Sequence, residues 1–231
     1  IRGCELGVQG QYGEIHLLGL WLPRHSAPLD AELARLRGHR EERNLKILDR
    51  LRSIGINIGY QEVLDEAGGE SVGRPHIARV LQKRGIVSNF AQAFELYLGY
   101  YGAAYVPRTL LTPEEGVSLM ADLGAVVSFA HPMLIRCPPS WFDEIIPRLK
   151  EAGLGAIEAY HSEHSARDER FCVELAARYG LGLSGGSDYH GMAKPGVELG
   201  RGKGGLRVTV ALLDALKARR KRPVDDAPEV L

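Results

Sequence analysis

The sequence predicts an α/β protein with a parallel sheet and an all-helical insertion. Three short apolar runs in the second half, AVVSFA, LGAIEAY and LGLSGG, follow one another at intervals of about 27 to 29 residues, with helical segments between them. Short buried strands that alternate with helices form β-α-β crossovers, and these give parallel sheets that are open or closed into a barrel. The length of 231 residues suits one large domain or a domain with an insertion.

The first element predicted is a β-hairpin. Strand-like residues at 5–8 and 14–20 flank the segment QGQYG. A turn on Gly10 and Gln11 would set a register that places Glu5 opposite His16, whereas a one-residue slip would put them on opposite faces or make them diagonal neighbours. A carboxylate among apolar neighbours needs a partner, which is either a divalent ion shared with imidazoles or a plain Glu–His hydrogen bond.

The stretch that follows shows helical periodicity and no strand pattern, with apolar residues such as Leu45, Leu48 and Leu51 on one face. It predicts an inserted lid or subdomain at residues 29–104, with residues 1–28 and 105–231 forming the α/β part.

Three helices are expected between the later strands. Thr112 and Pro113 form a helix start, Ser140 could cap a helix that accommodates Pro147 by a bend, and Ser165 could cap the last one before Gly180.

The composition excludes or disfavours several classes of protein. Hydrophobic residues make up 45% and charged residues 25%, which excludes a disordered chain. Lys+Arg and Asp+Glu each number 29, so zero net charge argues against a general nucleic-acid binder; the basic cluster at 217–222 is a solvated helix end or a local nucleic-acid contact. No membrane span or signal peptide is visible, and three cysteines without a C-x-x-C pair indicate neither a disulfide framework nor a thiolate zinc site. We expect a cytoplasmic protein.

Candidate metal ligands follow two of the predicted strands. His131 comes directly after AVVSFA, and Asp188 and His190 come just after LGLSGG. Because ligands bind at the carboxyl ends of strands in α/β folds, these residues can converge. The alternative is a hydrogen-bonded histidine at a strand end. His161 and His164 have a short metal-ligand spacing that suits a polar rim equally well.

Basic residues elsewhere could bind phosphate. Arg74 and His76 flank Pro75 at a predicted helix start, which is a natural anion site, and Arg108 closes the segment YVPR. The sequence contains no G-x-x-x-x-G-K-[ST], G-x-G-x-x-G, G-x-S-x-G or H-E-x-x-H motif, so Walker-type nucleotide binding and serine hydrolase chemistry are disfavoured.

Several segments, in this order, resemble the polymerase and histidinol phosphatase (PHP) family and its branch of small metal-dependent phosphoesterases. They are GCEL, EIHLLGL, GRPHIARVLQKRGIV, YLGYYGAAYVPR, VVSFAHP, GAIEAYHSEH and GGSDYHG. The resemblance implies a distorted (β/α)7 barrel with an inserted helical domain and two or three divalent ions at the mouth. It makes Glu5 the bridging carboxylate. The other implied ligands are His16, His131, Asp188 and His190, and the implied substrate-binding residues are Arg74, His76 and Arg108.

The sequence departs from the family pattern at its start. Members open with an H-x-H strand end, an Asp and a further His, none of which is present upstream of Glu5. About five of nine family ligands remain, and the expected fold lacks its first strands, which leaves an open edge and a half-lined site. Either the sequence omits residues of a longer chain, or it is a truncated copy with impaired activity.

The resemblance implies hydrolysis of phosphate esters of nucleotides, either 3′,5′-bisphosphates or RNA 5′ ends, by metal-activated water. Asp188, His190 and His131 would be the catalytic residues, and imidazole and carboxylate ligands accept Mn²⁺, Fe²⁺ or Zn²⁺. The partner expected is a small phosphorylated substrate, a nucleotide or oligoribonucleotide, and no membrane. The alternatives are a catalytically impaired binding or regulatory module of this fold and a histidinol-phosphate phosphatase.

Overall fold

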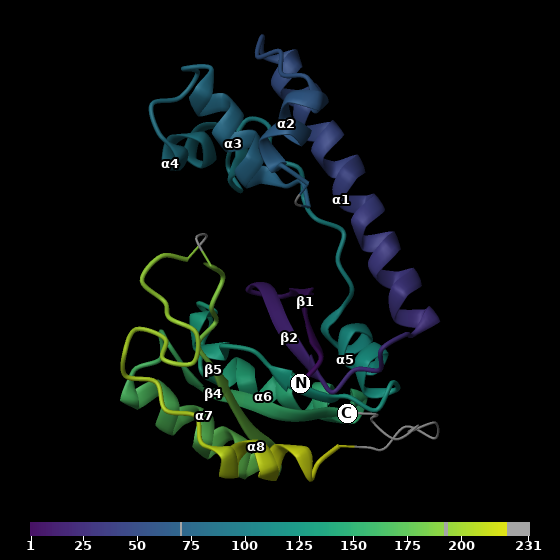
Figure 1. Ribbon diagram of the computed structural model, residues 1–231, viewed down its shortest axis with the longest axis vertical. Helices are drawn as coiled ribbons and strands as arrows, with labels where there is room; N and C mark the ends of the chain where they lie inside the picture. The colour runs from purple at the N-terminus through teal and green to yellow at the C-terminus, as the bar shows by residue number, and fades with distance from the viewer. Residues whose placement is uncertain (70, 192–193, 221–231) are drawn as a thin grey trace. The chain divides into compact units, whose positions relative to one another are not determined.

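The computed structural model describes residues 1–69, 71–191 and 194–220. The chain divides into two units: Ile1–Leu29 with the described residues from Leu110 onward, and Asp30–Thr109. The first unit holds a sheet and the second is helical (Figure 1). The predicted α/β class is confirmed. The assignment of 1–28 and 105–231 to a PHP barrel around a subdomain at 29–104 stays a prediction.

In the described residues five strands form one sheet in the order β1-β2-β3-β4-β5. The first three strands pair antiparallel and the last three pair parallel. The change of direction follows from the connections, because a tight turn joins β1 to β2 while helices join β3, β4 and β5. The strands are β1 (Gly3–Gly10), β2 (Gly13–Leu20), β3 (Val126–Phe129), β4 (Leu154–His161) and β5 (Gly182–Gly186).

The hairpin of β1 and β2 corrects the predicted register. The turn lies on Gln11 and Tyr12 rather than on Gly10 and Gln11, since Gly10 pairs with Gly13. Gly13 has φ +129°, a conformation that glycine adopts without strain, so the turn closes one position later than predicted. Glu5 therefore faces Leu18, two positions beyond His16. Glu5 and His16 are diagonal neighbours on one face of the sheet.

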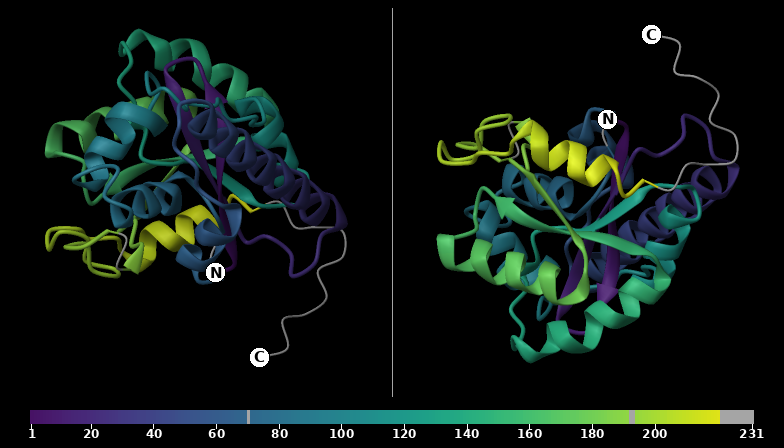
Figure 2. Two further views of the ribbon diagram at one scale, coloured as in Figure 1. Left: turned by 90° about the horizontal axis from the view of Figure 1, so that it is seen from above. Right: turned by 90° about the horizontal axis from the view of Figure 1, so that it is seen from below.

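Helices pack on both faces of the sheet. Val126 and Ala156 contact Leu216 of α8 on one face, and Phe129 contacts Phe142 of α6 on the other, with ring centroids 6.2 Å apart. Figure 2 shows α8 and the pair α6–α7 on opposite sides of the strands. The helices of this unit are α5 (Pro113–Ala121), the 3₁₀ turn η2 (Pro132–Leu134), α6 (Ser140–Ala152), α7 (Ala166–Tyr179) and α8 (Val210–Lys217).

Two of the three predicted helix starts are confirmed. The hydroxyl of Thr112 accepts a hydrogen bond at the start of α5, and that of Ser165 does so at the start of α7, each within a capping box. The prediction that Ser140 caps a helix is wrong. α6 begins at Ser140 itself after Pro139, without a side-chain cap, and Pro147 lies inside the helix.

The second unit has an aliphatic core and, among its described residues, no strand. Ile47, Leu51, Ile77 and Leu81 are fully buried in it. Its helices are α1 (Ala27–Ser53), which begins in the first unit, α2 (Tyr60–Ala67), α3 (Arg74–Lys83), α4 (Phe90–Ala93) and the π-helical turn η1 (Phe94–Leu98). The predicted helical character of this stretch is confirmed.

None of the helices in the described part of the chain is long and apolar enough to cross a membrane. Of the basic cluster at 217–222, Lys217 ends α8, whereas residues 221 and 222 lie outside the described residues. The three cysteines, Cys4, Cys137 and Cys172, are free.

Candidate metal centre

The candidate ligands come from β1 and β2 and from the loops that follow β3 and β5, and they meet at one edge of the sheet. β2 runs antiparallel to β3, so the start of β2 lies beside the carboxyl end of β3, and Ala130 donates its N–H to the carbonyl of His16 at 3.0 Å. This places His16 next to His131. The loop after β5 carries Asp188 and His190 to the same edge, because β3, β4 and β5 are parallel.

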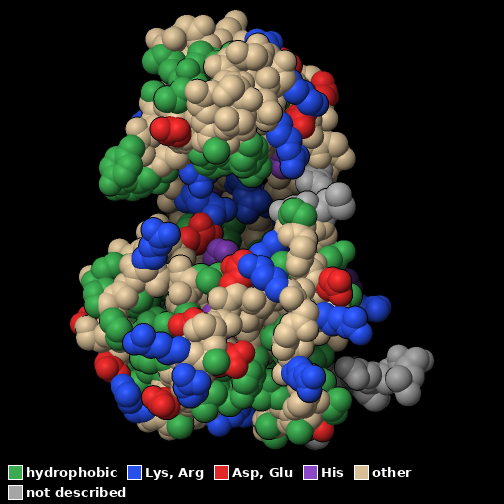
Figure 3. Space-filling view, turned by 90° about the vertical axis from the view of Figure 1, so that its left-hand side faces the viewer, with side chains coloured by type: hydrophobic (Ala, Val, Ile, Leu, Met, Phe, Trp, Pro, Cys, Tyr) green, Lys and Arg blue, Asp and Glu red, His purple; other side chains and the backbone are tan. Residues whose placement is uncertain are grey.

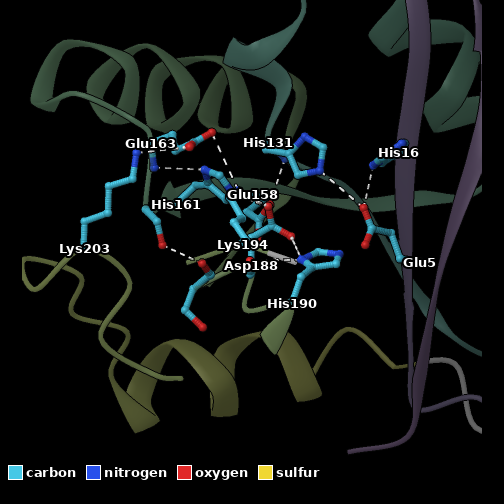
Figure 4. Close-up of polar contacts among 12 residues, drawn as sticks. Glu5, His16, His131, Glu158, His161, Glu163, Asp188, His190, Lys194 and Lys203 are labelled. Carbon is cyan, nitrogen blue, oxygen red and sulfur yellow. Dashed lines mark hydrogen bonds and ion pairs between the residues drawn. The ribbon is translucent and has the colours of Figure 1, made fainter. Parts of the chain in front are cut away.

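A first group of possible ligands consists of Glu5, His16 and His131. Glu5 Oε1 lies 2.6 Å from His16 Nδ1 and 3.4 Å from His131 Nε2. The two imidazole rings meet edge to face, with centroids 5.1 Å apart. One carboxylate thus lies between two imidazoles that come from different strands (Figure 4).

A second group consists of Glu5, Asp188 and His190, whose ligand atoms all lie within 4.8 Å of one another. Asp188 Oδ1 is 3.2 Å from His190 Nδ1. Glu5 belongs to both groups, and its side chain is 29% exposed, so its oxygens are accessible to a cation. A carboxylate shared by two sets of nitrogen and oxygen donors can bridge two ions.

The backbone is strained where two of these residues leave their strands. His131 has φ +29° and Asp188 has φ +52°, values that side chains with a Cβ rarely adopt. Such strain costs about 1–3 kcal/mol per residue and occurs mainly at functional sites. In both cases it accompanies a side chain that belongs to one of the two ligand groups.

The charges of the first group stabilise one another. Hydrogen bonds from His131 and then His16 hold the pKa of Glu5 well below its ordinary value. Hydrogen bonds to Glu14 and Glu5 raise the pKa of His16 to about 9. His16 is therefore protonated at neutral pH when no other cation is near, and a metal ion must displace that proton before the ring can bind it.

Glu158 was not among the residues predicted from the sequence. It lies on β4 with 4% of its surface exposed, and its Oε2 accepts the N–H of His131 at 2.8 Å. Burial raises its pKa to about 7. The signal in the sequence was an acidic residue inside the otherwise apolar run LGAIEAY.

His161 also lies in the site, at the end of β4. Its side chain is fully buried, so the polar-rim alternative does not hold for it. Nδ1 accepts the N–H of Glu163 at 3.1 Å, so the neutral ring carries its proton on Nε2, 3.4 Å from Asp188 Oδ2. Burial lowers the pKa of His161 to about 4. In His164, the other histidine of this pair, Nδ1 lies 2.9 Å from the carbonyl oxygen of Ala159.

A lysine from the loop after β5 occupies the other side of Asp188. Lys194 Nζ is 2.6 Å from Asp188 Oδ2 and 3.7 Å from Glu163 Oε2. Lys203 Nζ lies 3.1 Å from the second oxygen of Glu163. Asp188 thus has one oxygen near His190 and one near Lys194 and His161, as Figure 4 shows.

A cavity of about 400 Å³ opens beside the two ligand groups. Glu5, His131, Asp188 and His190 line it together with leucines of β2 and α8. In Figure 3 acidic and histidine side chains lie side by side at the surface of this unit. A polar corner within an apolar cavity is typical of a small-molecule site.

The donor set fits divalent metal ions. Two groups of three imidazole nitrogens and carboxylate oxygens converge on a shared carboxylate, next to a cavity that a substrate can enter. Neutral imidazoles and carboxylates together suit Mn²⁺, Fe²⁺ and Zn²⁺.

The predicted substrate-binding residues lie in the second unit. α3 begins at Arg74, one residue before the predicted start at Pro75, and His76 Nδ1 accepts the N–H of Gly73 at 3.1 Å. Arg74 donates to the carbonyl of Leu98 at 3.0 Å, and Arg108 is half-buried in the segment that returns to the sheet unit. The contact of these residues with substrate stays a prediction.

Comparison with known proteins finds relatives that are named for the cleavage of phosphate esters. The chain is 30% identical over 202 residues to the 5′-3′ exoribonuclease Rnm of Escherichia coli. The aligned region covers 87% of this chain and 68% of that protein. It is 26% identical over 226 residues to the 3′,5′-nucleoside bisphosphate phosphatase of Chromobacterium violaceum. That aligned region covers 97% of this chain and 79% of that protein. No family model matches the sequence.

Two solved structures share the fold of this chain. A candidate metal-dependent phosphoesterase from Bifidobacterium adolescentis superposes with a TM-score of 0.77 and 26% identity, covering 95% of this chain and 76% of that one. An amidohydrolase from Chromobacterium violaceum, solved with sulfate and without metal, gives a TM-score of 0.75 and 27% identity, covering 96% and 78%. The ordered motifs, the ligand groups at the strand ends and these relatives lead to one conclusion. The chain belongs to the PHP family of metal-dependent phosphoesterases.

Proposed function

We propose that this phosphoesterase hydrolyses phosphate esters of nucleotides, either nucleoside 3′,5′-bisphosphates or the 5′ ends of short RNA, at a centre of two or three divalent ions. The observation that carries the proposal is the position of Glu5, which lies within reach both of His16 and His131 and of Asp188 and His190. The curated relatives act on RNA and on nucleoside bisphosphates, as their names state.

In the proposed centre Glu5, His16 and His131 would hold one ion, and Glu5, Asp188 and His190 would hold a second. The chemistry that such ions supply when bound is acidification of water and neutralisation of phosphoryl oxygens. The metal is Mn²⁺, Fe²⁺ or Zn²⁺, because the ligands are imidazoles and carboxylates.

The chain's own residues orient this centre. His161, neutral because burial lowers its pKa, would orient Asp188, whose Oδ2 lies 3.4 Å from the Nε2 of His161. Glu158 holds the strained backbone of His131 through the N–H of that residue. His131, Asp188 and His190 are the proposed catalytic residues, since they line the cavity in which a phosphate ester would bind.

The substrate's remaining phosphate requires cationic partners. Arg74, His76 and Arg108 are the proposed ones, as a guanidinium binds phosphate with two parallel hydrogen bonds. The cytoplasm is the proposed location, because the three cysteines are free and a reducing compartment keeps them so.

The test measures metal content and turnover together. Purified protein is analysed for bound metal and then assayed with adenosine 3′,5′-bisphosphate, a 5′-phosphorylated oligoribonucleotide and histidinol phosphate. We expect metal-dependent hydrolysis of one of the first two substrates. Preference for histidinol phosphate would identify the rival phosphatase, and bound metal without turnover would identify a binding module.

Two variants test whether turnover depends on the proposed metal centre. His190→Ala should abolish the metal-dependent turnover, whereas His25→Ala, which changes an exposed histidine outside both ligand groups, should leave it unchanged. Full activity of the His190→Ala variant at saturating metal would contradict the proposal.

A further inference from the structure

We propose that Lys194 competes with a metal ion for Asp188 and thereby makes the second ligand group the weaker of the two metal sites. Glu163 is the alternative partner, which accepts the ammonium of Lys194 when an ion binds to Asp188. The inference rests on the proposed function, because it takes both ligand groups as metal sites. It adds that their affinities are unequal and names the residues that make them so.

The two ligand groups differ in the charges beside them. At the first group, Glu14 Oε1 lies 3.6 Å from His16 Nε2 and adds a negative charge. At the second group, Lys194 Nζ lies 2.6 Å from Asp188 Oδ2, and a lysine carries a full positive charge at neutral pH. The negative charge beside the first group and the positive charge beside the second favour a cation at the first.

The two carboxylate oxygens of Asp188 have different partners (Figure 4). Oδ1 lies 3.2 Å from Nδ1 of His190, which belongs to the same ligand group, whereas Oδ2 lies next to Lys194. An ion that binds to Asp188 would share this carboxylate with the ammonium of Lys194. The two positive charges would then repel each other unless the lysine side chain moved.

The side chain of Lys194 can move while its backbone stays in place. The backbone N–H of Lys194 donates to the carbonyl of Gly191 at 3.3 Å, and its carbonyl accepts the N–H of Val197 at 3.4 Å. The side chain is 26% exposed, and a lysine stem of four carbons is flexible. The ammonium can therefore leave Asp188 without any unfolding of the loop.

Glu163 offers a second acceptor for this ammonium. Its Oε2 lies 3.7 Å from Lys194 Nζ, too far for a hydrogen bond but close enough that a small movement would form one. Its Oε1 lies 3.1 Å from Lys203 Nζ, which helps to hold the carboxylate beside the loop. The neutral His161, with Nε2 3.4 Å from Asp188 Oδ2, remains next to Asp188 when the lysine leaves.

The charge of Lys194 should outweigh any orienting effect of its hydrogen bond on Asp188. Two unit charges about 4 Å apart near a protein surface interact strongly enough to change an affinity roughly 1000-fold. Loss of an outer hydrogen-bond partner changes metal affinity roughly 10- to 100-fold in the opposite direction. Because movement toward Glu163 also reduces the repulsion, we expect removal of the lysine to raise the affinity about 10-fold.

The test measures the affinity of the purified protein for Mn²⁺, with the free ion detected by electron paramagnetic resonance. We expect the wild type to bind Mn²⁺ with unequal affinities, and Lys194→Met to raise the affinity of the weaker site about 10-fold without changing the stronger one. Lys194→Arg keeps the charge and should bind like the wild type. Lys203→Met removes the same charge from the other oxygen of Glu163 and should leave both affinities nearly unchanged.

A double-mutant cycle tests the role of Glu163. Glu163→Gln should lower the affinity of the weaker site, because Lys194 loses its alternative partner and stays on Asp188. The same substitution in a Lys194→Met background should have little effect, since no ammonium is left to move. An equal decrease in both backgrounds would contradict the role of Glu163 as the acceptor.

Three results would overturn the inference: a lower affinity in Lys194→Met, an unchanged affinity in that variant, or an equal increase in Lys203→Met. Absence of Mn²⁺ binding by the wild type and by Lys194→Met alike would also overturn it. Lys194→Gln provides the same comparison if Lys194→Met does not fold. Turnover is measured separately. If the wild type binds Mn²⁺ and hydrolyses no phosphate ester, the proposed function fails while the affinities still decide the inference.

Discussion

The sheet unit and the helical unit bury polar side chains in different ways. In the helical unit such side chains bond to backbone groups: Arg43 donates to the carbonyl of Val106 at 2.7 Å, and Asn44 donates to that of Val72 at 3.1 Å. In the sheet unit two buried titratable side chains lie against candidate metal ligands: His161 Nε2 is 3.4 Å from Asp188 Oδ2, and Glu158 Oε2 accepts the backbone N–H of His131.

This difference distinguishes buried side chains that stabilise the fold from buried side chains that belong to a site of chemistry. A buried side chain that satisfies a backbone group stabilises the fold, because the backbone group would otherwise lose its hydrogen bond to water. A buried acid or imidazole next to another titratable group has a displaced pKa and costs stability, and such groups mark sites of chemistry. We therefore expect variants of the two kinds to affect different measurements.

The largest effect is expected for Glu5→Gln. Loss of the shared carboxylate charge weakens both ligand groups at once, so activity should fall by more than the roughly 10- to 100-fold that loss of an outer partner costs. Metal analysis should show reduced binding of every ion. Glu14→Gln is the matched control, because Glu14 lies 3.6 Å from His16 on the same hairpin but belongs to neither ligand group. Equal losses in the two variants would contradict the bridging role.

Glu158→Gln should change how stability depends on pH. The pKa of Glu158 is about 7 in the folded protein against an ordinary 4.5, so the folded state binds the additional proton. Its stability contribution is present below pH 4.5 and is lost as pH rises through 7, by about 3 kcal/mol in all. Urea titrations of metal-free protein between pH 4.5 and 8 should show this loss in the wild type and not in the variant. Equal pH dependence of the free energy of unfolding in the wild type and the variant would contradict this prediction.

His161→Phe should weaken metal binding by roughly 10- to 100-fold while the protein stays folded. The phenyl ring preserves the volume of a fully buried side chain but removes the Nε2 proton that faces Asp188. Metal titration measures the effect. His164→Phe is the control, because its ring is 5.1 Å from that of His161 and its nitrogen faces a backbone carbonyl instead. The prediction fails if both variants bind metal like the wild type.

The smallest effect is expected for Asn44→Ala in the helical unit. It removes one hydrogen bond to the half-buried carbonyl of Val72 and should lower the free energy of unfolding by about 1 kcal/mol, with metal binding and turnover unchanged. Urea unfolding measures the change, and Asn57→Ala, at an exposed position, should be near neutral. A loss of metal in Asn44→Ala would break the distinction between the two units.

Much of the candidate site was predictable because it follows from strand ends. His131, Asp188 and His190 could be chosen from the sequence, since the carboxyl ends of parallel strands lie at one edge whatever the details of packing. The same reasoning applied to LGAIEAYH would have selected His161, which ends the strand between the other two. The hairpin was predicted with its register wrong, because one glycine conformation at Gly13 decided where the turn closes.

The sequence by itself determined the alternation of strands and helices, two of the three predicted helix caps and the candidate ligands, because these depend on local periodicity and on chain direction. Only the tertiary structure decided that Glu5 belongs to two ligand groups, that Glu158 and His161 are buried beside them, and that Lys194 pairs with Asp188. The physical reason is that burial and charge interactions depend on which distant segments pack together, and no local pattern in the chain encodes those distances.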